Sequence, residues 1–204
     1  NPPPRPQGKR DSLCLSAADP VRREGAVERL KSYLPIARRF DAILVIGLLQ
    51  GLTSDEPDAE AAHARIAAGL REVGLAALDA GVELVVEPIN HLQVGFHHSV
   101  GEVRDLVAEV AVPAFKLMVD TIHMNIEETS LVDPIRACGA ALKHVHLCES
   151  NRALLGSGHI DFSSVLAALD EIGYAGFGSV KVYRKAGFRA AAAASLDYLR
   201  SQGG

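Results

Sequence analysis

The sequence predicts an α/β fold in which parallel strands alternate with helices, as an open sheet or a (β/α) TIM-type barrel. Short runs that are too apolar to be half exposed recur along the chain, and segments of helical periodicity separate them. Four of these runs end on a polar residue, as in barrels whose strand ends meet at one mouth. No glycine-rich phosphate loop follows any run, which disfavours a nucleotide-binding doubly wound sheet.

The elements can be assigned in chain order. A first helix begins at Asp19-Pro20, where an acidic N-cap precedes a proline, and we expect it to bend at Pro35. A long second helix ends before Gly81, a typical residue after a helix. The expected strands are 41–47, 82–87, 115–120, 142–147 and 176–182, and the expected helices are 20–37, 55–80, 99–110, 134–140, 162–172 and 188–200.

Composition indicates one globular domain. The chain has 204 residues, of which 48% are hydrophobic, enough for a substantial core. Residues 1–11 are rich in proline and predict a disordered leader, so the domain is expected to span 12–204. The three cysteines show no C-x-x-C spacing, which indicates reduced thiols rather than disulfides or a zinc knuckle.

Charge and hydropathy argue against two classes of partner. The formal net charge is -4, and basic residues are scattered among acidic ones, so no surface for nucleic acid is expected. No apolar run reaches the roughly 18 residues that span a bilayer, and no charged-then-apolar leader opens the chain. We therefore expect a cytoplasmic protein that acts on a small molecule.

Polar residues at strand ends form the candidate site. Glu87, Asp120, His146 and Lys181 lie at the carboxyl ends of four expected strands, separated by one βα unit each. In a parallel barrel these ends line one mouth, so the side chains should come together. Two carboxylates and an imidazole suit a divalent cation, and Glu87, Asp120 and His146 are therefore the expected metal ligands.

Each of these residues also has a purely structural explanation. Glu87 alone could be a surface charge, Asp120 could cap the next helix, and His146 could be a core histidine with satisfied hydrogen bonds. The occurrence of the same pattern on consecutive strands favours a shared metal site over three separate explanations.

Four stretches carry a resemblance to a known family. They are EPIN at 87–90, DTIHMNIEE at 120–128, HVHLCESNR at 144–152 and GSGHIDF at 156–162. In this order they resemble the sugar phosphate isomerase/epimerase family of xylose isomerase-like TIM barrels, whose relatives include ketose 3-epimerases and hydroxypyruvate isomerases. The resemblance covers residues 13–199 and implies an eight-stranded barrel, of which about five or six strands are expected here, as if the barrel were truncated at its N-terminus.

The resemblance implies a role for each site residue. The three expected metal ligands fall on metal ligands of the family, and Glu87 also falls on a carboxylate that transfers a proton. His123 and Arg152 fall on residues that contact substrate hydroxyls, and for Arg152 a solvated loop charge is the alternative. His159, in the glycine-rich loop, is a further candidate for substrate contact.

Lys181 departs from the family pattern. It stands where the family has a glutamate that is both a fourth ligand and a second acid/base. An ammonium is not a metal ligand, and it is unfavourable beside a cation unless its pKa falls or a carboxylate intervenes. Lys181 could donate a proton, hold a substrate carboxylate or mark a loss of activity.

The expected function is that of an isomerase or epimerase of a small sugar, sugar phosphate or hydroxy-keto acid. An enediolate would form with Glu87 as base and Lys181 as the other candidate catalytic group. One divalent metal ion is expected, with manganese first and cobalt, magnesium or zinc as alternatives. The edges of an incomplete barrel favour a homo-oligomer.

Two other functions compete with this expectation. One is a non-catalytic relative that binds a sugar-like ligand, which Lys181 and the missing strands favour. The other is an apurinic endonuclease relative, which would need more histidine ligands and a basic surface.

Overall fold

A computed structural model describes residues 13–183 and 187–202 of the chain. Its centre is a five-stranded parallel sheet whose strands lie in chain order. The strands are β1 (Leu44–Ile46), β2 (Leu84–Val86), β3 (Phe115–Asp120), β4 (Leu142–Cys148) and β5 (Phe177–Lys181). The predicted parallel α/β architecture is confirmed. The predicted leader at 1–11 lies outside the described residues.

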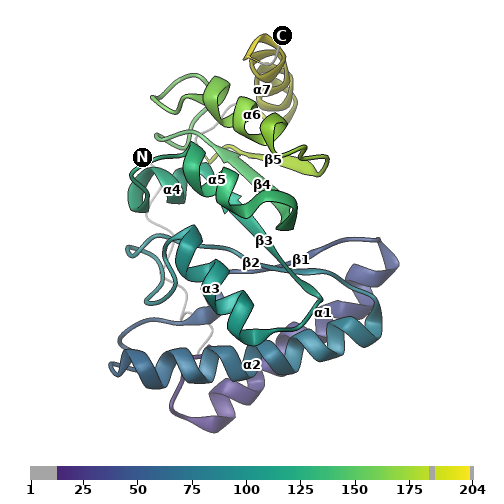
Figure 1. Cartoon of the computed structure of the whole chain (residues 1–204), viewed down its shortest axis with the longest axis vertical. Coiled ribbons are helices and arrows are strands. Elements are labelled where there is room, and N and C mark those ends of the chain that lie inside the picture. The colour runs from purple at the N-terminus through teal and green to yellow at the C-terminus, as the bar shows by residue number, and fades with distance from the viewer. Residues whose placement is uncertain (1–12, 184–186, 203–204) are drawn as a thin grey trace.

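Helices follow the strands and form an outer layer beside the sheet (Figure 1). The helices are α1 (Pro20–Arg39), α2 (Ala59–Ala80), α3 (Val100–Val110), α4 (Thr121–Glu127), α5 (Val132–Cys138), α6 (Phe162–Glu171) and α7 (Phe188–Gln202), with short 3-10 turns η1 (Leu48–Gln50) and η2 (Gly139–Ala141). In this layer α1 packs against α2, α2 against α3, α5 against α6, and α6 against α7. The strands and helices together form a half-barrel.

Local capping sets the helix boundaries. The Asp19 carboxylate accepts from Val21 N at the start of α1, and this helix continues through Pro35 to its end. Asp58 caps α2, so the helix begins later than the expected residue 55. Gly81 ends α2 in the left-handed conformation, with φ 66°, which glycine adopts without strain.

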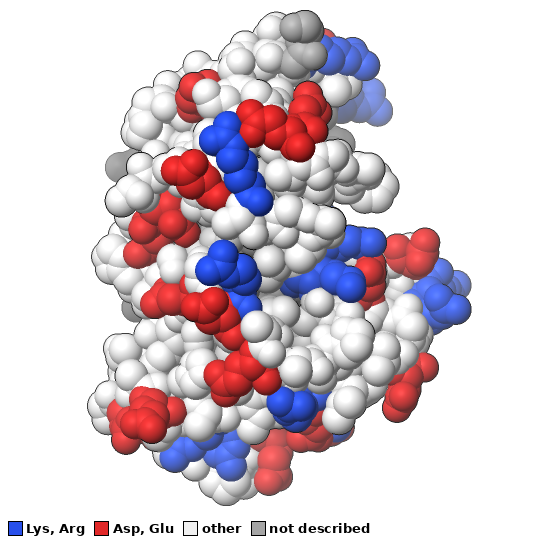
Figure 2. All heavy atoms as spheres, viewed as in Figure 1, with Lys and Arg blue, Asp and Glu red and all other residues white. Residues whose placement is uncertain are grey.

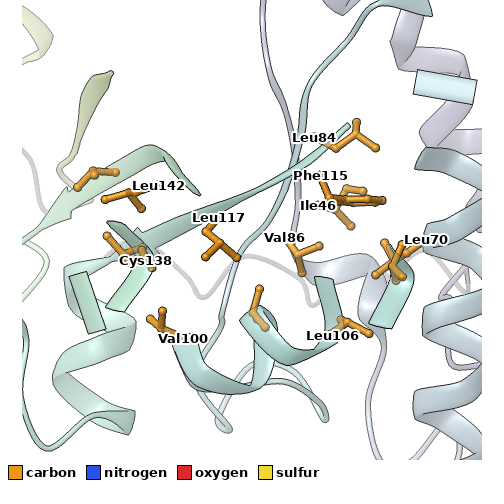
Figure 3. Packing of buried hydrophobic residues seen from close by; sticks show 14 of the residues in the cluster. Ile46, Leu70, Leu84, Val86, Val100, Leu106, Phe115, Leu117, Cys138 and Leu142 are labelled. Carbon is orange, nitrogen blue, oxygen red and sulfur yellow. The ribbon is translucent and has the colours of Figure 1, made fainter. Parts of the chain in front are cut away.

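The hydrophobic core lies between the sheet and the outer helices. Figure 3 shows Val86 of β2 and Leu117 of β3 near Val100 and Leu106 of α3, and all four side chains are buried. All three residues of β2 are buried, as expected for a strand inside a parallel sheet. This packing holds the strands in place, and the residues of the candidate site lie at their carboxyl ends.

The two outer strands have open edges within the described residues. β1 and β5 each have one neighbouring strand there. Phe177 on β5 is 83% exposed and Phe188 on α7 is 87% exposed, so large apolar side chains lie at this end of the sheet. A cavity of about 530 Å³ between β5 and α7 is lined mainly by apolar side chains. The expected open edges are therefore present in this part of the chain.

The surface in view carries mixed charge. Figure 2 shows lysine and arginine side chains interspersed with acidic ones on this face, without a basic stripe. Within residues 13–183 and 187–202, no helix combines the length and the hydropathy needed to cross a bilayer.

Candidate functional site

Four strand ends bring the expected site residues together. Glu87 directly follows β2, and its N–H donates to Ile46 O at 2.8 Å, which extends the ladder by one residue. Asp120 and Lys181 are the last residues of β3 and β5, and His146 lies near the end of β4. Because the strands are parallel, all four side chains lie at the carboxyl edge of the sheet.

The Lys181 ammonium occupies the point on which the other three side chains converge. Its Nζ lies 2.7 Å from Asp120 Oδ2, 3.0 Å from Glu87 Oε1 and 3.0 Å from His146 Nδ1. The Asp120 side chain is fully buried and that of Glu87 is 10% exposed. The three groups that the sequence assigns to a metal therefore surround a lysine in this structure.

The charged groups in this cluster stabilise one another in their ionised forms. Burial opposes the charged form of Lys181, but the carboxylates of Asp120 and Glu87 outweigh it and raise the pKa of Lys181. Burial also opposes ionisation of Asp120, whereas the hydrogen bond from His146 and the Lys181 charge hold the pKa of Asp120 well below its usual range. Both groups are therefore ionised at neutral pH.

His146 has several partners for a single nitrogen. Its Nδ1 lies 2.8 Å from Glu87 Oε1 and 3.3 Å from Asp120 Oδ2, as well as beside Lys181. Burial lowers the pKa of His146, but its hydrogen bonds to Asp120 and Glu87 outweigh this effect and raise it. Nδ1 can donate to a carboxylate or accept from the ammonium, but one proton position cannot serve both.

Asp120 uses its two oxygens for different tasks. Oδ2 faces Lys181, whereas Oδ1 accepts from Ile122 N at 3.1 Å and caps α4. The sequence did not predict α4, which starts directly after β3 without a loop. The helix-cap explanation of Asp120 is therefore confirmed for Oδ1, and it leaves Oδ2 available for the predicted site.

His123 joins the site from the first turns of α4. Asn90 Nδ2 lies 2.7 Å from His123 Nδ1 and donates to it, so the neutral ring carries its proton on Nε2, which lies 3.9 Å from Asp120 Oδ2. Glu87, Asp120 and His123 offer possible metal-ligand atoms that all lie within 4.8 Å of one another. Sequence reasoning assigned His123 to substrate contact and missed Asn90, three residues after Glu87.

Arg152 and His159 lie in the loop between β4 and α6, which starts at the carboxyl edge of the sheet and is called the rim of the site below. The Arg152 guanidinium is 5.4 Å from the centre of the Tyr183 ring, and its backbone has φ 58°. His159 is exposed, and its Nε2 lies 3.1 Å from Asn125 Oδ1. Among the hydrogen bonds of the described residues, none joins either side chain to Lys181 or its partners. Their proposed contact with substrate therefore depends on a ligand that reaches the rim.

Glu149 anchors the loop that carries these two rim residues. It is fully buried, and its carboxylate accepts from the backbone N–H groups of Ser150, Gly156 and Ile160 at 2.8, 3.0 and 3.1 Å. Burial raises the pKa of Glu149, but these hydrogen bonds outweigh it and lower the pKa below its usual value. Glu149 was not predicted as a site residue, although it lies in the stretch 144–152 that carries the family resemblance.

The donor set is suited to a divalent cation under one condition. Two carboxylates and an imidazole are ligands that Mn²⁺, Mg²⁺, Co²⁺ and Zn²⁺ accept. Their bonds to metal are about 2.0–2.2 Å long, shorter than the distances that separate the same atoms from Lys181 Nζ. The residues therefore fit a cation when the Lys181 side chain has left the centre.

Comparisons with known proteins agree with the family resemblance seen in the sequence. Residues 7–202 match the model of the family described as xylose isomerase-like TIM barrel. A D-psicose 3-epimerase from Enterocloster bolteae is 34% identical over 175 residues, which are 82% of this chain and 56% of that protein. An L-ribulose 3-epimerase from Mesorhizobium japonicum is 31% identical over 164 residues, which are 79% of this chain and 55% of that protein.

A solved structure of similar fold supports the same family. The crystal structure of a D-psicose 3-epimerase from Clostridium cellulolyticum H10 with D-tagatose superposes with a TM-score of 0.83 and 28% identity. The match covers 94% of this chain and 75% of that one. The chain spans slightly more than half the length of the curated relatives it matches.

Proposed function

Because the chain belongs to the xylose isomerase-like TIM barrel family, we propose that it acts in the isomerisation or epimerisation of a small sugar, sugar phosphate or hydroxy-keto acid. The carrying observation is the convergence of Glu87, Asp120 and His146 on one positive charge. This convergence lies at the carboxyl ends of parallel strands, where barrel enzymes place their active sites. Relatives named as 3-epimerases of psicose and ribulose support the same class of reaction.

Both reactions begin with the loss of a proton from a carbon next to a carbonyl. In the proposed step Glu87 accepts this proton, the C–H bond breaks, and its electron pair moves into an enediolate. The enediolate is anionic and is stabilised by a preorganised positive charge. His123 would donate its Nε2–H to a substrate oxygen, and Lys181 would return a proton to carbon.

We assign the positive charge that stabilises the enediolate to a divalent metal ion. Glu87, Asp120 and His146 would hold it, with Mn²⁺ as first choice and Co²⁺, Mg²⁺ or Zn²⁺ as alternatives. When bound, such an ion polarises the substrate carbonyl and stabilises the enediolate. Arg152 and His159, at the rim, would contact substrate hydroxyls or a phosphate.

Hydrogen exchange tests the proposal without knowledge of the exact substrate. The protein is supplied with Mn²⁺ in D₂O with a panel of ketoses, ketose phosphates and hydroxy-keto acids, and NMR follows deuterium entry next to the carbonyl. We expect exchange that slows by about 100-fold or more in Glu87→Gln. Glu83→Gln, which changes a glutamate at the other end of β2, should retain it. No exchange across the panel would overturn the proposal.

A second candidate function is sugar binding without catalysis. It is favoured by the Lys181 ion pairs, which balance the buried carboxylates without any metal. Lys181→Glu separates the two candidates, because it introduces a third carboxylate in place of the ammonium. If the wild type shows no hydrogen exchange and Lys181→Glu gains it, the natural protein binds sugar without catalysis. If the wild type shows exchange and Lys181→Glu loses it, Lys181 has a catalytic role.

A further inference from the structure

Lys181 has the surroundings of a bound cation rather than of a surface lysine. Its Nζ contacts ligand atoms from three different strand ends, at 2.7 to 3.0 Å. The side chain is 23% exposed, and its partners Asp120 and His146 are 0% and 13% exposed. The acceptors on β3 and at the end of β2, with His146 of β4 beside them, therefore hold one positive charge in a partly buried position.

Another lysine on the same sheet shows what an ordinary ion pair looks like here. Lys143, at the start of β4, pairs with Glu83 before β2, with Nζ 2.5 Å from Glu83 Oε2. Both side chains are well exposed, at 44% and 39%. Such an exposed pair contributes little to stability and neutralises no buried group. Lys143 can therefore serve as a control for Lys181, because the two lysines lie at opposite ends of neighbouring strands.

A metal ion and the Lys181 ammonium cannot share this position. The three atoms nearest to Nζ are the same atoms that would ligate the metal. A metal bonded to all three would overlap the ammonium, and two cations at such short range in a partly buried site repel strongly. Metal binding therefore requires the lysine side chain to move away.

We propose that Lys181 is an internal competitor of the divalent cation, which fills the cation position in the metal-free protein and leaves it when metal binds. The inference deepens the proposed function, because it rests on the cation assignment of Glu87, Asp120 and His146. Two consequences follow. The metal-free site keeps its charges balanced, and the apparent metal affinity is reduced by the fraction of molecules in which the lysine occupies the centre.

Metal titration of purified metal-free protein tests the inference directly. Mn²⁺ binding is measured by calorimetry and by electron paramagnetic resonance for the wild type, Lys181→Met and Lys143→Met. We expect Lys181→Met to bind one Mn²⁺ per chain at least about tenfold more tightly than the wild type, since the competing ammonium is gone. Lys143→Met should match the wild type. Equal affinity of the wild type and Lys181→Met, or no binding by Lys181→Met, would overturn the inference.

A second measurement needs no variant and guards against a fold defect in Lys181→Met. The wild type is treated with an amine-reactive reagent with and without Mn²⁺, and mass spectrometry quantifies the label on each lysine. Labelling of Lys181 should rise when Mn²⁺ binds, and labelling of Lys143 should stay constant. Bound Mn²⁺ without a rise at Lys181 would contradict displacement. Neither experiment reads catalysis, so failure of ketose exchange is distinguishable from failure of this inference.

Discussion

Single carboxylates hold this site and its surroundings in place. Asp120 divides its oxygens between a helix N-terminus and Lys181. Both carboxylate oxygens of Glu149 accept hydrogen bonds from backbone N–H groups of one loop. A buried carboxylate with all its acceptors in use is costly to alter, because each donor that loses its partner remains buried.

The first prediction concerns Glu149→Gln. The amide replaces one acceptor oxygen by a donor that faces backbone N–H groups, so we expect the free energy of unfolding to fall by about 1–3 kcal/mol. Urea unfolding measures the change, and hydrogen exchange should become faster in loop 150–160. The control is Glu171→Gln, which alters an exposed pair with Arg136 and should leave the free energy of unfolding almost unchanged. Equal losses in both variants would contradict the anchoring role.

The second prediction is a pH dependence caused by His97. Its ring nitrogens lie 2.9 Å from Gln50 Oε1 and 2.9 Å from His63 Nδ1, and burial lowers the pKa of His97 to about 4. The unfolded chain takes up a proton here below a pH of about 6.5, whereas the folded chain does so near 4, so stability falls as pH drops between these values.

Urea unfolding of the wild type and His97→Gln at pH 7 and pH 5 measures this effect. The wild type should lose more stability over this interval than the variant, by on the order of 1 kcal/mol. Comparing each protein with itself removes the constant cost of the substitution. An equal drop in the two proteins would show that His97 does not carry the pH dependence.

The strand-end residues of the site could be predicted from the sequence, because parallel strands bring their carboxyl ends to one edge whatever the side chains are. The position of Lys181 Nζ could not, because it depends on the path of a long flexible side chain. Asn90 and Glu149 were also missed, since their hydrogen bonds depend on how loops fold back. Rigid elements are predictable at this scale, and loop contacts are not.

At the scale of elements, the strands were predicted best because burial on both faces demands continuous apolar runs. The structure shortens β1, β2 and β5, as in β1, which is Leu44–Ile46 within the expected 41–47, whereas β3 has its expected bounds and β4 extends one residue further. The α-helix that was missed is α4, whose seven residues begin directly after the last residue of β3 and give too short a periodic pattern. Local hydrogen bonds of Asp120 and the buried side chains of its first turns stabilise it instead.

The third prediction tests how closely α2 packs on the sheet. A Cβ at Gly74 would lie 2.7 Å from a ring carbon of Phe115 and 3.1 Å from Val112. Gly74→Val should therefore overpack this contact and lower the free energy of unfolding by about 1–3 kcal/mol. Gly101→Ala in α3 is the control, because the nearest atom to its Cβ would be 3.9 Å away. It should be neutral or stabilising by up to about 1 kcal/mol in thermal unfolding. A stabilised Gly74→Val would contradict the packing.

At the scale of the whole molecule, the apolar end at β5 bears on the proposed homo-oligomer. Phe177 and Phe188 are almost fully exposed there, beside a strand edge without a neighbour in the described residues. Large apolar groups next to an open edge favour association with another chain.

The fourth prediction follows from this surface. We expect the wild type to self-associate with rising concentration in sedimentation velocity, and Phe177→Lys to shift the equilibrium towards monomer by adding a charge at the edge. Val21→Lys changes another well-exposed apolar residue, 74% exposed at the start of α1, and should leave association unchanged. Similar shifts in both variants would mean that β5 is not the contact.

Strand order also shapes how this chain can fold. Each described strand pairs with the strand just before or just after it in the chain, so each pairing among them spans a single βα unit. Paired residues are then closer in sequence than they would be in a sheet with a shuffled strand order, and one βα unit can dock on the previous one during synthesis. In docking that follows chain order, β5 would be the last of the described strands to join the sheet, and Lys181 would arrive with it. Glu87, Asp120 and His146 would then come together before the lysine, so we expect the cation position to be open at that stage of synthesis.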